Sequence, residues 1–325
     1  MRQINKVLKF SFNKALLLIW VFIFIAIGMK APNFLKSSYV IDVMIRNIIE
    51  IGMVALPMTL IIITGGIDLS VGNTMILSAM LGGIAYTKWG GLIAILVTLL
   101  TGVLCGWLNG VIITKVKVSP MVTTLATMYL FLGLARGLSK GESVYSYPFS
   151  EYLGNTKMIG LPIQIWLYIL LAVIFVILLS YTTFGRRLYS IGLNQHATRY
   201  AGVHTDRIVI ILYILCGVIC ALAAFIFLGR FTSVKYDAGT SFNLKVITVV
   251  VLGGTSILGG VGDIKGTILA TLIIATLNSG LTILNIPVDV QTIVQGIVLI
   301  IALIACAVVN IRSKKKSIVK VKMES

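Results

Sequence analysis

Charged residues are scarce in this sequence, and acidic residues are the scarcest of them. Only 11% of the 325 residues are charged, with 10 Asp or Glu against 27 Lys or Arg. A water-soluble domain usually carries about 25% charged residues. Because 58% of the residues are hydrophobic and most long apolar runs have no polar face, lipid must cover them. The composition therefore excludes a water-soluble domain and predicts an all-α bundle in a membrane.

The residue types and motifs that carry most enzyme chemistry are also rare. There are two histidines, His196 and His204, and no cluster of carboxylates or cysteines accompanies them. Cys216 and Cys220 are four residues apart in an apolar run, which favours packing over a redox or metal motif. The stretch 259–267 approaches a phosphate-binding P-loop, but its spacing and its Lys-Gly pair do not fit. We therefore expect no catalytic residue, no metal and no cofactor, and we expect that the chain is not an enzyme.

What the sequence does contain is a series of long apolar runs. A membrane-spanning helix needs roughly 20 apolar residues, and about ten segments qualify. The third and eighth are short and border glycine clusters, which suggests broken or re-entrant helices. The first has no small-residue cleavage site close behind it, so we expect a retained span. The ten segments are Ala15–Met29, Met44–Ile63, Ser70–Tyr86, Leu92–Ile113, Met121–Leu134, Ile163–Tyr181, Ile208–Leu228, Leu244–Leu258, Thr267–Leu284 and Thr292–Asn310.

The net charge of +17 lies in the loops between these segments. With both termini in the cytoplasm, 17 of the 27 Lys and Arg residues fall on the inner side, as the positive-inside rule requires. This arrangement favours membrane lipid over nucleic acid as the partner of the basic residues, above all for the cytoplasmic tail 311–325. The longest loops are 136–162, expected outside, and 182–207, expected inside. No segment is long enough for a separate soluble module, so residues 1–325 read as one transmembrane domain.

Two glycine-rich passages have similar patterns. Residues 61–72 and 249–260 each contain three apolar residues, then Gly-Gly, then a closing glycine, at an offset of 188 residues. Glycine allows close backbone approach and helix breaks, and paired interrupted segments are typical of transporters built from repeats. The predicted topology gives both passages the same orientation, which does not favour an inverted repeat.

The inner loop 184–203 is basic and has glycines near both ends. Ala197, Tyr200 and Ala201 are three and four residues apart, so one helical turn could present a small apolar face. A short surface helix of this kind suits docking into the groove of a partner protein. The alternative is a basic loop held only by phospholipid.

Four passages resemble the ribose-type permeases of bacterial ABC importers. They are Thr64–Gly72, Asn109–Thr114, Phe184–Val203 and Val251–Gly260, and their order and spacing fit that family from about residue 45 to 305. Ile51–Leu60 and Ala238–Phe242 look most like the autoinducer-2 and rhamnose branch. Many relatives carry an acidic pair where this chain has Asn243-Leu-Lys245, which weakens any transfer of ribose specificity.

The resemblance implies a permease subunit in a bacterial inner membrane. Its expected partners are two cytoplasmic ATPase subunits, a second permease that is identical or homologous, and an extracytoplasmic solute-binding protein. ATP hydrolysis would then lie on a separate subunit. The resemblance also implies that the loop 184–203 couples the chain to the ATPase, through Gly185, Arg186, Gly192, Asn194, Ala197 and Gly202.

Polar residues inside apolar sequence are candidates for a solute pathway or gate. Asp68 is the only acid between Glu50 and Glu142, and a carboxylate in hydrocarbon costs about 2.5–3.5 kcal/mol on insertion scales. It could serve a gate, or it could cap the next helix together with Ser70. The full candidate set is Gly65, Gly66, Asp68, Ser70, Asn73, Gly253, Gly254, Asn278 and Gln295.

Other polar and aromatic groups have a structural and a functional interpretation. Asp42, Arg46 and Glu50 are spaced by four, which predicts an ion ladder on one helix face. Asn278 and Gln295, with Thr282 and Gln291, could line a path for sugar, but polar residues more often hold helices together. We expect packing or interfacial roles for Tyr129, Phe227 and Phe231 rather than sugar platforms.

Three functions remain open. The leading hypothesis is an importer permease for a small sugar-like solute such as autoinducer-2, rhamnose or ribose. An ion-coupled secondary transporter is the alternative, but it needs intramembrane carboxylates, and only Asp68 is a strong candidate. A scaffold without transport activity would not need glycine-broken segments.

Overall fold

The computed structural model describes residues 2–298 and 300–301, with side chains from residue 12 onward. Helices make up almost the whole of this part, and four two-residue strands lie in its loops. In chain order the elements are α1 (Arg2–Lys30), η1 (Pro32–Leu35), α2 (Ser37–Tyr39), η2 (Val40–Ile45), η3 (Arg46–Ile48), α3 (Ile49–Ile63), α4 (Val71–Trp89), α5 (Gly91–Val111), η4 (Ile112–Val116), α6 (Pro120–Leu138), β1 (Val144–Tyr145), α7 (Pro148–Asn155), β2 (Lys157–Met158), β3 (Leu161–Pro162), α8 (Ile163–Tyr181), α9 (Thr183–Leu193), α10 (Gln195–Tyr200), α11 (Thr205–Phe231), β4 (Ser233–Val234), α12 (Phe242–Leu252) and α13 (Ile264–Ile283).

The polytopic helical bundle predicted from composition is confirmed. Among the described residues, seven helical stretches are long and apolar enough to cross a membrane: Phe12–Lys30, Ser37–Ile63, Gly91–Val116, Pro120–Leu138, Ile163–Tyr181, Thr205–Phe231 and Ile264–Ile283. The other three predicted segments correspond to α4, α12 and the helix Val288–Val298. The tenth predicted segment runs on beyond the described residues.

The third and eighth predicted segments differ from one another. The eighth is a short helix, as expected, because α12 has only 11 residues. The third is not broken, because α4 continues for 19 residues. Its chain break lies before it, in the loop 64–70.

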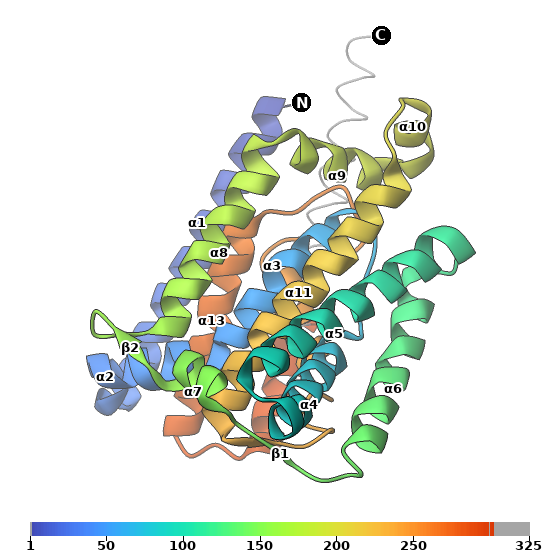
Figure 1. Cartoon of the computed structure of the whole chain (residues 1–325). Helices are drawn as coiled ribbons and strands as arrows, with labels where there is room; N and C mark the ends of the chain where they lie inside the picture. The colour runs from blue at the N-terminus through green and yellow to red at the C-terminus, as the bar shows by residue number, and fades with distance from the viewer. Residues whose placement is uncertain (1, 299, 302–325) are drawn as a thin grey trace.

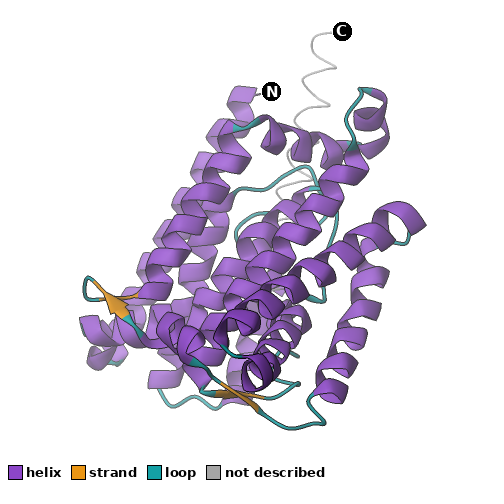
Figure 2. Ribbon diagram, in the orientation of Figure 1, coloured by secondary structure: helices purple, strands orange, loops and turns teal. Residues whose placement is uncertain are grey.

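The helices alternate in direction between two ends of the bundle (Figure 1). The end that carries the start of α1, α9 and α10 is called the inner end here, and the end that carries α7 and the strands is the outer end. Both two-stranded antiparallel sheets lie at the outer end (Figure 2), with Val144 opposite Val234 and Lys157 opposite Pro162. The predicted inner loop 182–207 and outer loop 136–162 thus lie at opposite ends.

Helix α3 is the centre of the bundle. Every one of its 15 residues is buried, and it packs against α8, α11, α12 and α13. By contrast, only 11% of the apolar stretch in α1 is buried. A helix that is apolar on all sides can lie inside a protein or against lipid, and here α3 takes the inside position.

Helices α5 and α11 cross with their backbones in close approach, and glycines permit it. Gly102, Gly106 and Gly110 recur every fourth residue along one face of α5. A Cβ at Gly102 would lie 2.2 Å from the carbonyl oxygen of Gly217, and one at Gly106 would lie 2.2 Å from that of Tyr213. Small residues at this spacing are a common packing device in membranes.

The two glycine-rich passages end α3 and α12 in the same way. After α3, Gly65 has φ +84°, the Gly65 N–H donates to Ile62 O at 2.9 Å, and the Gly66 N–H donates to Ile61 O at 3.1 Å. After α12, Gly254 has φ +85°. The Gly254 N–H donates to Val251 O at 2.9 Å, and the Thr255 N–H donates to Val250 O at 3.3 Å, so the same two bonds recur. Both ends are Schellman caps, which place glycine in the left-handed conformation. The structural match is offset by 189 residues, one more than the sequence match.

Candidate functional site

The inner end carries two short helices, α9 and α10, which together contain most of the predicted coupling loop. Helix α9 turns away from α8 at Thr182, whose backbone is extended (φ −102°, ψ 162°) and whose Oγ1 caps α9 by accepting a hydrogen bond from the Gly185 N–H at 3.3 Å. A Cβ at Gly185 would lie 2.1 Å from Leu179 O, so the turn requires glycine. Arg186 follows on α9 and is exposed.

Helix α10 projects from the inner end and exposes most of its side chains (Figure 1). Asn194 caps it, since Asn194 Oδ1 accepts from the Ala197 N–H at 2.9 Å. Gly202 ends it with φ +82°. Ala197 is exposed, and Tyr200 is 91% exposed. The predicted small apolar face of Ala197, Tyr200 and Ala201 is therefore present and exposed in the described chain, while its coupling role stays a prediction.

Gly192 of α9 lies in a junction of backbone segments that we call the glycine junction (Gly65, Gly192, Gly259 and Gly260). A Cβ at Gly192 would lie 1.9 Å from Ile63 O and 2.4 Å from the Gly260 nitrogen. The Gly260 N–H donates to Ile63 O at 2.8 Å. Both glycine-rich passages thus meet α9 at one point, which the sequence did not predict.

Side chains fix α9 to the loop that follows α12. Tyr189 Oη donates to Gly262 O at 2.8 Å, and burial, helped by nearby Asp263, raises the pKa of the Tyr189 phenol. The phenol is therefore neutral and can donate at any physiological pH. Asp263 caps α13, and Asn13 of α1 donates to its carboxylate at 3.0 Å.

The remaining candidate glycines serve close packing at the inner end. A Cβ at Gly253 would lie 2.6 Å from the Thr267 nitrogen at the start of α13. Gly254 lies against the ring of Phe12 in α1. Gly66 lies beside Tyr213, whose hydroxyl is 3.1 Å from the position that a Cβ would take. These positions join α3 and α12 to α1, α11 and α13.

Asp68 is buried, and its hydrogen bonds are those of a local turn. Its Oδ1 accepts hydrogen bonds from the Ser70 N–H at 2.9 Å and from Ser70 Oγ at 2.7 Å. Ser70 directly precedes α4, which begins at Val71. Asn109 donates to Ser70 Oγ at 2.9 Å, and Thr127 donates to Asn109 Oδ1 at 2.7 Å. This chain of polar groups ties the loop 64–70 to α5 and α6. Ser70 is the N-cap residue of α4, but no side chain there accepts a hydrogen bond from the first amides of the helix, so Asp68 closes the turn before α4 and does not cap it. The gate role of Asp68 stays a prediction.

The other polar candidates form no hydrogen bond with Asp68 in the described chain. Asn73 on α4 donates to Met128 O at 2.7 Å. Asn278 of α13 accepts from Gln295 at 2.9 Å, which holds the helix Val288–Val298 against α13. Asn278 also lines a small cavity of about 80 Å³ together with Asn47 and Thr282. Gln295 therefore joins two helices through a polar contact. Asn278 takes part in that contact and also lines the small cavity.

The predicted ladder of Asp42, Arg46 and Glu50 is wrong. Asp42 pairs with Lys157 at 2.8 Å, and Glu50 pairs with Arg230 at 2.6 Å. Arg46 instead donates to Gly154 O and to Asn155 Oδ1, both at 2.5 Å. The helical register is interrupted here by the π-turn η2 and the 3₁₀-turn η3, and each side chain finds a partner on another element.

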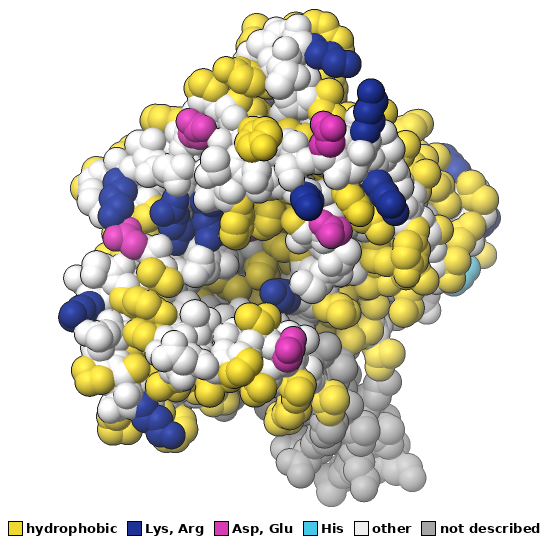
Figure 3. All heavy atoms as spheres, turned by 90° about the horizontal axis from the view of Figure 1, so that it is seen from below, with side chains coloured by type: hydrophobic (Ala, Val, Ile, Leu, Met, Phe, Trp, Pro, Cys, Tyr) yellow, Lys and Arg dark blue, Asp and Glu magenta, His cyan; other side chains and the backbone are white. Residues whose placement is uncertain are grey.

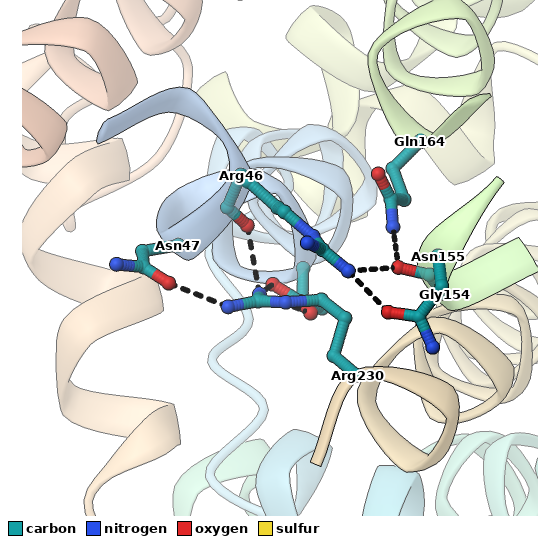
Figure 4. A network of polar contacts seen from close by, with 7 residues as sticks. Arg46, Asn47, Gly154, Asn155, Gln164 and Arg230 are labelled. Atoms are coloured by element: carbon teal, nitrogen blue, oxygen red, sulfur yellow. Dashed lines mark hydrogen bonds and ion pairs between the residues drawn. The ribbon is translucent and has the colours of Figure 1, made fainter. Parts of the chain in front are cut away.

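Arg230, at the end of α11, is the centre of a buried polar network at the outer end. It donates to both Glu50 oxygens, to Arg46 O at 2.7 Å and to Asn47 Oδ1 at 2.5 Å. In Figure 4, Arg230 lies between Asn47 on one side and Arg46 with the end of α7 on the other. The side chains of Arg230 and Glu50 are only 9% and 4% exposed. A buried pair of this kind needs additional hydrogen bonds to offset desolvation.

The Arg230 network forms one wall of the outer pocket, a hollow of about 230 Å³. The pocket lies among α3, α11 and α12 and is lined by Asn47, Glu50, Phe227, Arg230, Phe242 and Lys245, among others. Figure 3 shows the outer face hollowed near its centre, with basic side chains at the margin of the hollow.

Sequence reasoning did not single out Arg230, Asn47 or Lys245 as site residues. A signal for the first was present, because Glu50 lies within an apolar segment and an acid there needs a basic or polar partner. Nothing in the sequence, however, placed residue 230 beside residue 50. In the sequence, Lys245 stands out only because many relatives carry an acidic pair at this place.

Comparisons with known proteins agree with this architecture. Residues 40–303 match the family described as branched-chain amino acid transport system / permease component. The chain is 38% identical to the ribose import permease protein RbsC of Bacillus subtilis (strain 168), over 86% of this chain and 88% of that protein. It is 34% identical to the autoinducer 2 import system permease protein LsrD of Escherichia coli (strain K12), over 93% of each chain. No solved structure matches.

These relatives are permeases, and seven apolar helices are present in the described residues. The chain is thus a multi-pass protein of the bacterial inner membrane with a transport role, and permease subunits of this kind are not themselves catalytic. It belongs to the branched-chain amino acid transport system / permease component family, among the ribose-type permeases of ABC importers.

Proposed function

We propose that this chain is the membrane-spanning subunit of an ATP-driven importer for a small sugar or sugar-like solute. The observation that carries the proposal is the inner-end arrangement: α10 is exposed, while α9 is fixed to both glycine-rich passages. A force applied to α10 by a partner protein would move α9. Because α9 contacts the end of α3 and the loop after α12, its movement would shift both. The relatives named for ribose and autoinducer 2 support the solute class.

The partner for α10 is a cytoplasmic ATPase. Tyr200, 91% exposed, and the exposed Ala197 form a face small enough to enter a groove on another protein. A solute-binding protein at the outer end would deliver the solute, and a second permease, identical or homologous, would complete the membrane unit. Both partners follow from the family, and the solute could be autoinducer 2, rhamnose, ribose or a similar monosaccharide.

Co-purification tests the ATPase contact. We expect the double variant Ala197→Glu/Tyr200→Glu to lose its ATPase subunit during affinity purification, because two charges would enter an apolar contact. Tyr152→Glu is the matched control, since Tyr152 is 53% exposed on α7 at the opposite end. It should retain the ATPase. Full retention by the double variant would contradict the proposed docking of α10.

Asp68 distinguishes this function from ion-coupled transport. In Asp68→Asn the amide oxygen can still accept both hydrogen bonds from Ser70, so we expect uptake close to that of the native chain. In Asp68→Ala the turn before α4 loses both hydrogen bonds from Ser70, and a typical hydrogen bond contributes about 0.5–1.5 kcal/mol to stability. Uptake by reconstituted vesicles and thermal unfolding check both variants. Abolished uptake in Asp68→Asn, with native stability, would favour the ion-coupled alternative.

A further inference from the structure

The outer pocket has the size and lining of a site for a small solute. Its volume of about 230 Å³ lies below the range of about 300–1,000 Å³ for drug-sized ligands. Apolar walls with a few polar groups are typical of ligand sites, and this pocket combines phenylalanine rings with amide, hydroxyl and charged groups. The rings of Phe227 and Phe231 lie 4.6 Å apart between centroids and form one side. These two rings border the cavity in addition to packing against one another.

The charges in the pocket are not balanced. Arg230 is satisfied by Glu50, Asn47 and Arg46 O, so this cation has its partners within the protein. Lys245 is half-buried in the same pocket, and among the described residues it forms no hydrogen bond or ion pair. After Glu50 has offset Arg230, the pocket keeps one uncompensated positive charge.

An unpaired, half-buried ammonium group favours an anion beside it, since a buried charge is costly without a partner. The site is a hollow of about 230 Å³, and Lys245 is among the residues that line it. This shape suits a small molecule better than an acidic segment of a binding protein. Asn47 and Ser241, also in the lining, supply donors and acceptors for hydroxyl groups.

We propose that the outer pocket binds a sugar-like solute that bears an anionic group, a carboxylate or a phosphate, and that Lys245 pairs with that group. The inference rests on the proposed import function and narrows its solute class. It assigns Lys245 as the residue that determines charge selectivity, with Asn47 and Ser241 as hydroxyl partners and the phenylalanine rings as the apolar wall.

Binding to the full chain in lipid nanodiscs tests the proposal. The probes are D-ribose, D-ribonate, D-ribose 5-phosphate and inorganic phosphate, measured by calorimetry and by thermal shift. We expect ribonate, ribose 5-phosphate or both to bind more tightly than ribose. Lys245→Met should weaken that binding by about tenfold or more, as expected for a lost charge-assisted contact. Lys235→Met is the control, because Lys235 is exposed and is not among the residues that line the pocket.

Each outcome decides the proposal. Preference for ribonate alone or for ribose 5-phosphate alone supports it and identifies the anionic group. Equal binding of ribose, equal binding of inorganic phosphate and ribose 5-phosphate, unchanged anion binding in Lys245→Met, or no binding of any probe overturns it. The proposal is also overturned if the native chain binds no anion and Lys245→Met loses the docking of the binding protein. ATPase retention, measured on the same preparation, tests the import function separately.

Discussion

Gly192→Ala is expected to reduce ATP-driven solute uptake by at least about tenfold. The added methyl group would lie 1.9 Å from Ile63 O and 2.4 Å from the Gly260 nitrogen, and both atoms belong to backbone that cannot turn aside. Overpacking of this kind costs about 1–3 kcal/mol or more, so α9 must separate from the glycine junction. Uptake by proteoliposomes that contain the reconstituted importer provides the measurement.

ATPase retention distinguishes a loss of coupling in Gly192→Ala from a loss of folding. Because α10 is unaltered, the ATPase should still co-purify with Gly192→Ala and should still hydrolyse ATP. Gly137→Ala is the matched control, since no atom lies within 4 Å of the position that its Cβ would take on α6. It should transport normally and gain slightly in stability, because alanine favours helix. Native uptake by Gly192→Ala would show that the glycine junction does not transmit movement from α9.

Arg230→Met is expected to destabilise the chain by about 3–5 kcal/mol, because it leaves the Glu50 carboxylate buried without its cation. The pair is 2.6 Å apart with side chains only 9% and 4% exposed. Thermal unfolding in detergent, followed by tryptophan fluorescence, should show a lowered transition temperature. The loss of stability should be larger at neutral pH than at acidic pH. Protonation of Glu50 at acidic pH removes the buried negative charge that Arg230 neutralises in the native chain.

Two further variants make this expectation specific. Glu50→Leu/Arg230→Met removes both charges and should recover most of the lost stability, since replacing a whole buried pair is often neutral. Lys157→Met breaks the pair with Asp42, whose side chains are 52% and 34% exposed, and should cost no more than about 1 kcal/mol. Equal effects of Arg230→Met and Lys157→Met would show that burial does not decide the strength of these pairs.

Local patterns predicted much of the architecture. Apolar runs located the seven described helical stretches that are long and apolar enough to cross a membrane, because length and hydropathy define such stretches. The second predicted span ended before Gly65, as α3 does, but the eighth was predicted to run through Gly254 to Leu258, whereas α12 ends at Leu252. A Schellman cap at Gly254 ends this helix early. The ladder of Asp42, Arg46 and Glu50 failed because a π-turn and a 3₁₀-turn interrupt the register that an i, i+4 pattern assumes.

The structure places several residues predicted for the coupling loop at helix ends or at a backbone junction, while their coupling role stays a prediction. Asn194 and Gly202 begin and end the exposed helix α10, and Gly192 lies where the glycine-rich passages meet. The outer pocket was not predicted, because Asn47 lies 183 residues before Arg230 in the chain and the sequence does not place the two side by side. Their polar side chains also border apolar runs, where an interfacial role is the more frequent one.

The sequence by itself determined the helical membrane class, the main apolar spans, and the placement of the loops 136–162 and 182–207 at opposite ends of the bundle. Each of these depends on short-range pattern or on composition. Only the tertiary structure decided that α3 lies at the centre and α1 at the edge, that Arg230 satisfies Glu50, and that Lys245 has no partner among the described residues. The physical reason is that lipid and protein interior are both apolar, so hydropathy does not distinguish a buried helix from a lipid-facing one, and the partner of a buried charge depends on which helices touch.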